Sequence, residues 1–408
     1  MKATLRLKLH TDASTQSILH ETMRQYTACF NAVCRYGWES GERNGTRLHQ
    51  ATYHALRRQH QLLPSQLVVS ARMKATEALL SVHECKKQGK KVSCPQSDLC
   101  AVHYDARSYW TKLQEGSASL ATTCGRVVVS FRLPECYHQY LTWRTCSADL
   151  CYDARKKRFY LHVVVDTQAP EFSPKGQVVG CDLGIRRIAV TSTRQFFSSA
   201  RMHTRARQHQ HLKTQLQAKG TQSAKRHLQK VSRRWTRFQA CTNHQIANAI
   251  LARMQAGDTL ALEDLTGIRE RCKLRKGQRG LFHRWSFAQL GAFLSYKAER
   301  KGVLVIWVDP RNSSRTCSRC GYCDKQNRKN QSLFRCQQCG YTTNADFNAA
   351  QNLRQRGISS LARLLSESQS QPTAHSSSLA QAPEKALYDE CRGETQRAAS
   401  PQALAVGI

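Results

Sequence analysis

Three carboxylate residues lie where a metal-dependent hydrolase could use them. Asp182 ends an apolar run at residues 178–181, Glu263 ends a second at residues 259–262, and Asp346 precedes a helix-forming stretch. Two Mg²⁺ ions about 4 Å apart can activate a water and stabilise the leaving oxygen of a phosphodiester, and such cations prefer carboxylate ligands. If the three acids converge, the sequence predicts metal-dependent cleavage of nucleic acid.

Each acid also has a simpler explanation. A single Asp at the end of a strand is more often a turn former or a helix cap than a catalyst. Asp264 follows Glu263 directly, and alternation along a strand sends the two side chains to opposite faces. The strand pattern alone leaves open which of the two turns inward.

Four cysteines between the second and third acids form a metal-binding pattern. The pairs Cys317/Cys320 and Cys336/Cys339 are two Cys-x-x-Cys knuckles with 15 residues between them, which is typical of a structural Cys₄ zinc ribbon. Four thiolates leave no open position on the metal for a substrate. Cys323 is interpreted as a bystander. The competing interpretation, a redox dithiol, is weaker because it would favour one Cys-x-x-Cys at the start of a helix over two that flank a hairpin.

The order of these motifs resembles the TnpB (OrfB) family of transposon-encoded RNA-guided DNA nucleases, which are related to type V CRISPR effectors. The resemblance rests on Gly-Cys-Asp-Leu-Gly-Ile, Leu-Ala-Leu-Glu-Asp-Leu, the two cysteine knuckles and Asp-Phe-Asn-Ala-Ala-Gln-Asn, and it is specific over residues 176–356. It implies Asp182, Glu263 and Asp346 as the catalytic acids of a split RuvC core, holding two Mg²⁺ or Mn²⁺ ions. It also implies a noncoding guide RNA and a double-stranded DNA target beside a short motif.

The resemblance and the residue pattern together predict an α/β multidomain fold. The expected parts are an RNase H-like (RuvC) split core with an inserted Cys₄ zinc ribbon, and an N-terminal wedge β-barrel with a helical recognition insertion. The expected bounds are wedge 1–11 and 99–172, recognition lobe 12–98, nuclease core 173–314, zinc ribbon 315–342, third acidic segment 343–356, and a disordered tail 357–408.

The charge independently favours a nucleic-acid partner. The chain has 63 Lys and Arg against 28 Asp and Glu, for a net charge of +35, and a polyanion is the expected counterpart. No carboxylate occurs between Asp182 and Asp258, and residues 201–237 hold 11 Lys or Arg in a pattern that predicts a helical hairpin broken near Gly220. A basic run at 269–279 predicts a mobile lid. The candidate contact residues are Arg201, Arg205, Arg207, Lys225, Arg226, Lys230, Arg233, Arg234, Lys273, Arg275 and Lys276.

Hydrophobic periodicity predicts the elements that position these residues. A two-stranded hairpin is expected over residues 178–192, a helix over 285–301 and a strand over 303–308. In the N-terminal part, strands are expected at 4–9, 126–131 and 159–165, with helices over 14–88.

Other readings of the composition are weaker. Cys85, Cys94, Cys100 and His103 match no zinc-knuckle spacing, so reduced thiols are favoured over a second metal. The sequence shows no apolar run of membrane length and no signal peptide, which predicts a prokaryotic cytoplasmic, nucleoid-associated protein with no membrane partner. The alternatives to a guided endonuclease are a guided DNA-binding regulator that does not cut and a conventional three-carboxylate transposase.

Overall fold

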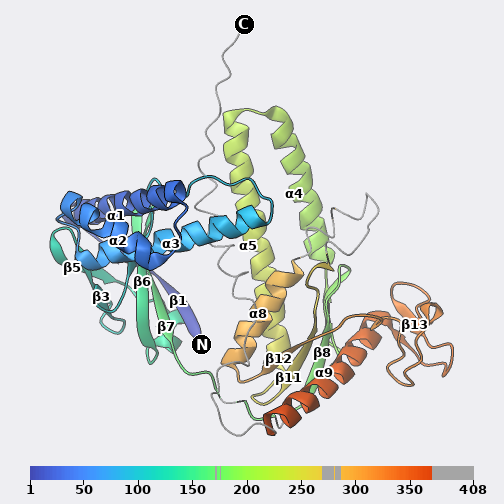
Figure 1. The fold of residues 1–408 in the computed structure, drawn as a ribbon. Helices are drawn as coiled ribbons and strands as arrows, with labels where there is room; N and C mark the ends of the chain where they lie inside the picture. The colour runs from blue at the N-terminus through green and yellow to red at the C-terminus, as the bar shows by residue number, and fades with distance from the viewer. Residues whose placement is uncertain (171, 175, 269–279, 281–285, 370–408) are drawn as a thin grey trace. The chain divides into compact units, whose positions relative to one another are not determined.

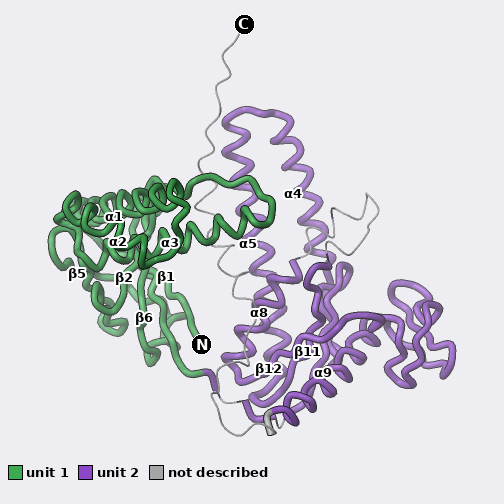
Figure 2. Tube along the Cα trace, in the orientation of Figure 1, with its two compact units in different colours: residues 1–168 green, residues 169–408 purple. Residues whose placement is uncertain are grey.

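The computed structural model describes all residues except 171, 175, 269–279, 281–285 and 370–408. The chain divides into two compact units, Met1–Gln168 and Ala169–Ile408, shown in different colours in Figure 2. The division falls four residues before the predicted boundary at 172. Among the described helices, none combines the length and the apolar character that a membrane crossing requires.

The first unit is a seven-stranded antiparallel sheet with three helices inserted after its first strand (Figure 1). The strand order is β2-β6-β7-β1-β5-β4-β3, and β3 also contacts β6, so the sheet curls back on itself. The elements are β1 (Lys2–His10), α1 (Ala13–Ser40), α2 (Gly45–Gln59), α3 (Ser65–Lys87), β2 (Val102–Tyr104), β3 (Tyr109–Lys112), β4 (Ser117–Thr122), β5 (Gly125–Phe131), the 3₁₀ turn Glu135–Tyr140, β6 (Arg144–Asp153) and β7 (Arg158–Asp166).

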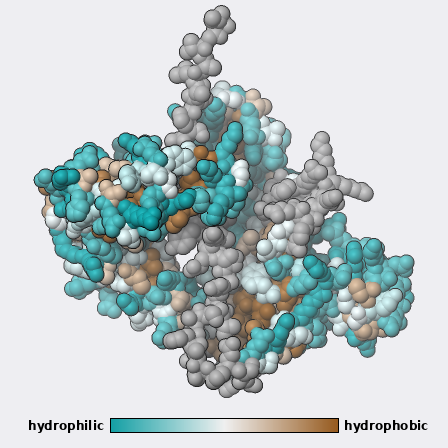
Figure 3. Space-filling view, viewed as in Figure 1, coloured by the Kyte–Doolittle hydropathy of each residue, from teal (hydrophilic) through white to brown (hydrophobic). Residues whose placement is uncertain are grey.

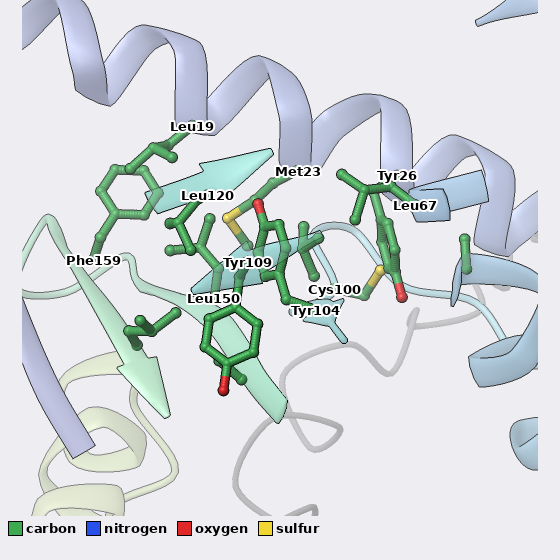
Figure 4. Close-up of a cluster of buried hydrophobic side chains, with 14 of the residues drawn as sticks. Leu19, Met23, Tyr26, Leu67, Cys100, Tyr104, Tyr109, Leu120, Leu150 and Phe159 are labelled. Atoms are coloured by element: carbon green, nitrogen blue, oxygen red, sulfur yellow. The ribbon is translucent and has the colours of Figure 1, made fainter. Parts of the chain in front are cut away.

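Alternating apolar residues place the core of this unit between the sheet and the helices. On β1, Leu5, Leu7 and Leu9 are buried while their neighbours are exposed, which is the period of a half-buried strand. Figure 4 shows side chains of α1, such as Leu19 and Met23, packed over residues of the strands. The predicted strands and the predicted helical insertion are confirmed.

The second unit contains a five-stranded mixed sheet in the order β10-β9-β8-β11-β12. β8, β9 and β10 are antiparallel neighbours, whereas β11 and β12 run parallel to β8. Its elements are β8 (Val178–Asp182), β9 (Arg187–Thr191), β10 (Phe196–Ser198), α4 (Ala200–Lys219), α5 (Gln222–Ala252), β11 (Thr259–Glu263), α8 (Phe287–Arg300), β12 (Leu304–Val308), the 3₁₀ turn Lys325–Asn327, β13 (Leu333–Arg335), β14 (Thr342–Asn344) and α9 (Ala345–Gln369).

Helices cover both faces of this sheet. α5 and α8 pack on one face, where Val179, Cys181, Leu260 and Leu262 belong to a single core cluster. α9 packs on the opposite face through a separate cluster that includes Val178 and Ala261. The strand residues alternate between the two clusters because successive side chains of a strand point to opposite faces.

The structure changes one predicted boundary. The disordered tail was predicted from residue 357, but α9 continues to Gln369. Leu361 and Leu364 of this last part pack against the sheet cluster. The prediction was wrong over these residues because two leucines among polar neighbours do not stand out as a buried face. The predicted disorder of residues 370–408 lies outside the described residues.

Candidate active site and metal centre

The strand directions bring two of the predicted acids to the same edge of the sheet. β8 and β11 are parallel neighbours, with Val179 opposite Leu260 and Cys181 opposite Leu262. Their carboxyl ends therefore lie side by side, with Asp182 ending β8 and Glu263 ending β11. The carboxyl edge of parallel strands is a common location for functional sites in α/β folds.

Alternation along the strands also fixes which face these acids occupy. Gly180 of β8 meets the backbone of α9, and Ala261 of β11 meets Gly357 of α9. Asp182 and Glu263 lie two residues beyond Gly180 and Ala261, so both point to the face that carries α9. Asp346 is in the first turn of α9, on this same side of the sheet.

Glu263 is the acid of its pair that turns inward. Its side chain is buried, and the Leu183 backbone N–H donates to its Oε1 at 2.6 Å. Asp264 is exposed, and its Oδ1 accepts a local bond from the Thr266 N–H at 2.9 Å. Glu263 thus joins the two strand ends, whereas Asp264 shapes the turn that follows.

Asp346 is held at the start of α9 by a cap and by two arginines. The Asn344 Oδ1 accepts from the N–H groups of Asp346 and Phe347, at 3.1 and 3.2 Å. The carboxylate of Asp346 pairs with Arg328 Nη2 at 3.6 Å and with Arg187 Nε at 3.9 Å. These pairs place Asp346 between β9 and the cysteine-containing segment.

Burial raises the pKa of all three acids, and the charge of a neighbouring acid adds to the rise for Asp182 and Glu263. Burial raises the pKa of Asp182 to about 7, and the charge of Asp346 adds to the rise while Arg328 opposes it. Burial raises the pKa of Glu263 well above its usual range, and the charge of Asp182 adds to this. Burial also raises the pKa of Asp346, against the influence of Arg328 and Arg187.

These shifts fit a site for divalent cations. Carboxylates that repel one another in a poorly solvated place are stabilised by a nearby positive ion, which favours their charged forms. Within the described part of the chain, the ligand atoms of the four cysteines lie within 4.8 Å of one another, and the three acids do not form such a group. Asp346 is instead paired with two arginines.

The four cysteine sulfurs have the arrangement of a tetrahedral metal site. Cys317 Sγ lies 3.7 Å from Cys339 Sγ, and Cys320 Sγ lies 3.5 Å from Cys336 Sγ. Four thiolates about 2.3 Å from a zinc ion would have sulfurs about 3.8 Å apart, so the cluster fits zinc. Cys323 is exposed and is not among the four. The described residues Cys85, Cys94, Cys100 and His103 form no comparable cluster.

The predicted basic hairpin is present, and it carries an ordered row of cations. α4 ends at Lys219, Gly220 caps it with a left-handed φ of 63°, and α5 follows. Arg226, Lys230, Arg233 and Arg237 of α5 repeat at intervals of four, three and four residues. At about 100° per residue these four lie within roughly 60° of one another on the helix, along about 16 Å of its axis. We call these four residues the α5 row.

The α5 row faces away from the hairpin's own apolar contacts. Those contacts join Leu216, Ala224 and Val231, with Leu212 and Leu228 partly buried against them. None of the row's residues forms an ion pair with a carboxylate of the described chain. Arg226, Lys230 and Arg233 of the row were predicted contacts, and Arg237 was not. The predicted contacts outside the row that are exposed are Arg201, Arg205, Arg207, Lys225 and Arg234. Lys273, Arg275, Lys276 and the predicted lid lie outside the described residues.

Sequence reasoning missed Arg328 and Arg187 as parts of the acid site. Arg328 is one of several cations between the knuckles, and nothing in the local pattern separates it from Lys325 or Lys329. The contact between Arg328 and Asp346 becomes visible only in the folded structure. The segment that carries the cysteines lies around β13 in Figure 1, and most of its surface in the same view is hydrophilic (Figure 3). This agrees with a segment rich in cations.

Comparison with known proteins finds similarity to CRISPR-associated and TnpB-like proteins. Residues 287–353 match the family model described as Cas12f1-like, TNB domain. The chain is 28% identical over 252 residues to the CRISPR-associated endodeoxyribonuclease Cas12f1 of Sulfoacidibacillus thermotolerans, a match that covers 55% of this chain and 56% of that protein. It is 33% identical over 112 residues to a TnpB-like protein of Methanocaldococcus jannaschii, covering 27% and 40%.

A solved structure supports the same relationship at the level of the fold. The cryo-EM structure of a Cas12f1-sgRNA-target DNA complex matches with a TM-score of 0.61 at 13% identity, covering 84% of this chain and 83% of that chain. The matches confirm the resemblance to TnpB-like type V effectors that the motifs predicted. The chain matches about half or less of the length of these curated relatives.

Proposed function

We propose that this protein is an RNA-guided DNA endonuclease that hydrolyses phosphodiester bonds with divalent metal ions. The observation that supports the proposal is that Asp182 and Glu263 end neighbouring parallel strands on the face that carries α9, and that Asp346 lies in the first turn of α9. Relatives bearing the names endodeoxyribonuclease and TnpB-like protein support it.

In this proposal, the acids would hold Mg²⁺ or Mn²⁺, which supplies an activated water and neutralises charge on the scissile phosphate. Glu263 is fixed by the Leu183 N–H, so it is a preformed ligand. Arg328 and Arg187, which pair with Asp346, would lie beside the scissile phosphate, where a guanidinium can pair with two oxygens.

The remaining parts have proposed roles in holding nucleic acid. The five-stranded sheet would be the RuvC core of an RNase H-like fold, and the four cysteines would hold one structural zinc. The first unit would supply the wedge and the recognition lobe. The α5 row would follow the phosphates of one strand of the guide RNA or its heteroduplex, because its cations lie about 4.5–6 Å apart along the axis and face away from the hairpin.

The test is to co-express the protein with its native downstream genomic flank and to sequence the RNA that copurifies. The complex is then incubated with a plasmid library that carries a guide-matched target beside randomised sequence. We expect cleavage in Mg²⁺ or Mn²⁺, loss of cleavage in Ca²⁺, and enrichment of one short flanking motif. Guide-dependent retention of target without any cutting would instead identify a binding regulator, and the absence of a specific RNA would contradict both functions.

A further inference from the structure

The arginine beside the acids comes from the loop that joins the two cysteine knuckles. Arg328 directly follows the 3₁₀ turn Lys325–Asn327, and its side chain is 30% exposed. Arginine has many rotamers, and holding one against a carboxylate costs side-chain entropy. The position of Arg328 at Asp346 therefore depends on how firmly its backbone is held.

The preceding residue provides that anchor. Asn327 is fully buried, and its side-chain amide bonds to the backbone of both knuckles. Its Nδ2 donates to Arg315 O at 2.8 Å and to Tyr322 O at 3.1 Å, on the two sides of the first knuckle. Its Oδ1 accepts from the Gln337 N–H of the second knuckle at 2.8 Å. One buried side chain thus bonds three backbone groups, of which Tyr322 O also accepts from the Cys317 N–H at 2.9 Å.

Two further buried asparagines attach the first knuckle to α9. Asn348 Oδ1 accepts from the Ser318 N–H at 3.0 Å, and its Nδ2 donates to Thr316 O at 2.8 Å. Asn352, one turn later, donates to Thr316 O and Ser313 O, at 2.6 and 2.7 Å. Asn348 lies only two residues after Asp346, so the acid and the knuckle share one rigid support.

Together these contacts form a closed circuit. It runs from Asp346 along α9 to Asn348, through the first knuckle to Asn327, and from Arg328 back to Asp346. We propose that Asn327 is a positioning residue that sets Arg328 against the acid site, so that the folded state of the zinc ribbon controls the geometry of cleavage. This inference rests on the proposed nuclease function.

The four cysteines would contribute through the same contacts. A zinc ion bound by both knuckles would fix their separation, which the side chain of Asn327 spans. Loss of the metal would allow the two knuckles to move apart, and the backbone of Arg328 would then no longer be held in place. The cysteine-containing segment would in this way act on the chemical step.

The test uses Asn327→Asp, which keeps the size of the side chain and an oxygen to accept from Gln337. It removes the two donated bonds to Arg315 and Tyr322. Asn330→Asp is the matched control, because Asn330 is exposed in the same loop and its Oδ1 accepts from Ser332 and Leu333. The control adds the same charge to the ribbon while preserving an acceptor for both local bonds.

Three measurements on the zinc-loaded protein separate positioning from general damage. Zinc content should stay equal in both variants, and guide and target binding should be unchanged. Single-turnover cleavage should fall by about 10- to 100-fold in Asn327→Asp alone, as expected for a small displacement of a group at the reacting centre. In the double variant with Arg328→Ala, Asn327→Asp should add no further loss, because it acts through that arginine.

A readout that does not require cleavage keeps the two hypotheses distinct. In ¹⁵N-arginine-labelled protein, the Arg328 signal is identified by its loss in Arg328→Lys and by its shift in Asp346→Asn. Asn327→Asp should move that signal toward its position in Asp346→Asn, and Asn330→Asp should not. An unmoved signal, or additive loss in the double variant, would overturn the positioning role. A moved signal in a wild-type protein that never cuts would contradict the nuclease proposal alone.

Discussion

Replacement of Gly180 by alanine should disable cleavage without touching an acid. Gly180 lies in β8 directly beneath α9, and a Cβ there would be 3.0 Å from Arg354 Cα and closer still to Ala350 O and Arg354 N. Carbon atoms pack at about 3.5–4.0 Å, so α9 would have to lift by about 1 Å. All three neighbouring atoms belong to the helix backbone, which cannot rotate away as a side chain can.

The expected cost is divided between stability and rate. Overpacking of this kind typically destabilises by about 1–3 kcal/mol. A 1 Å displacement of a catalytic group can cost about 100-fold in rate. Since Asp346 lies in the first turn of α9, the lift moves it away from Asp182 and Glu263. We therefore expect about 100-fold slower single-turnover cleavage with guide binding preserved.

Two comparison variants define the assay. Gly357 lies on the same helix as Gly180's contacts, about 16 Å along the axis from Asp346. A Cβ at Gly357 would meet Ala261 Cβ and Val178 Cγ1 of the sheet, so Gly357→Ala should have a smaller effect on the rate. Gly220→Asn is the control, because no other atom lies within 4 Å of a Cβ there and Asn tolerates its φ of 63°. Wild-type cleavage by Gly180→Ala at unchanged thermal stability would refute the idea that α9 seating places the third acid.

Three other outcomes follow from the structure. Burial raises the pKa of Asp182 to about 7, so in the metal-free protein this group binds a proton more tightly in the folded state than in the unfolded chain. Asp182 should therefore contribute a fall in melting temperature as pH rises from about 4 to 7. Asp182→Asn should reduce that fall and raise the melting temperature at pH 8; an unchanged pH profile would contradict the shift. Each Ala replacement in the α5 row should weaken RNA binding and reduce the slope of log affinity against log salt by about 1. Lys225→Ala, which lies off the row, should change the affinity and the slope less. Equal effects would show that the row is not a specific RNA-binding surface. Truncation after residue 356 should lower the melting temperature, because it removes Leu361 and Leu364 from the sheet cluster. Truncation after residue 369 should preserve cleavage. Equal stability of the two truncated proteins would show that the end of α9 is dispensable.

Much of the acid site could be predicted because the signals are local. An apolar run that ends in an acid indicates a strand end, and the parallel pairing of β8 and β11 then brings Asp182 and Glu263 together. The choice between Glu263 and Asp264 needed more than the strand pattern. It is settled by Ala261, which meets α9, because Glu263 must share that face.

The cysteine spacing predicted the four-cysteine cluster for the same reason, since chelation imposes short and regular intervals. The polar network around it could not be predicted. Asn327, Asn348 and Asn352 resemble ordinary loop and helix residues in the sequence, and their burial appears only when the knuckles fold onto α9. Arg328 likewise gains its position from a contact 18 residues along the chain, which no local pattern encodes.

The most direct test of the central claim is guided cleavage by the wild-type protein and by Asp182→Asn, Glu263→Gln and Asp346→Asn, with the same copurified RNA and target. Each replacement keeps the size of its side chain while removing one charge that would bind a metal ion. The nuclease account predicts that all four proteins bind the target, and that only the wild type cuts it in Mg²⁺ or Mn²⁺. Cleavage that persists in any of the three variants at the wild-type rate would contradict it.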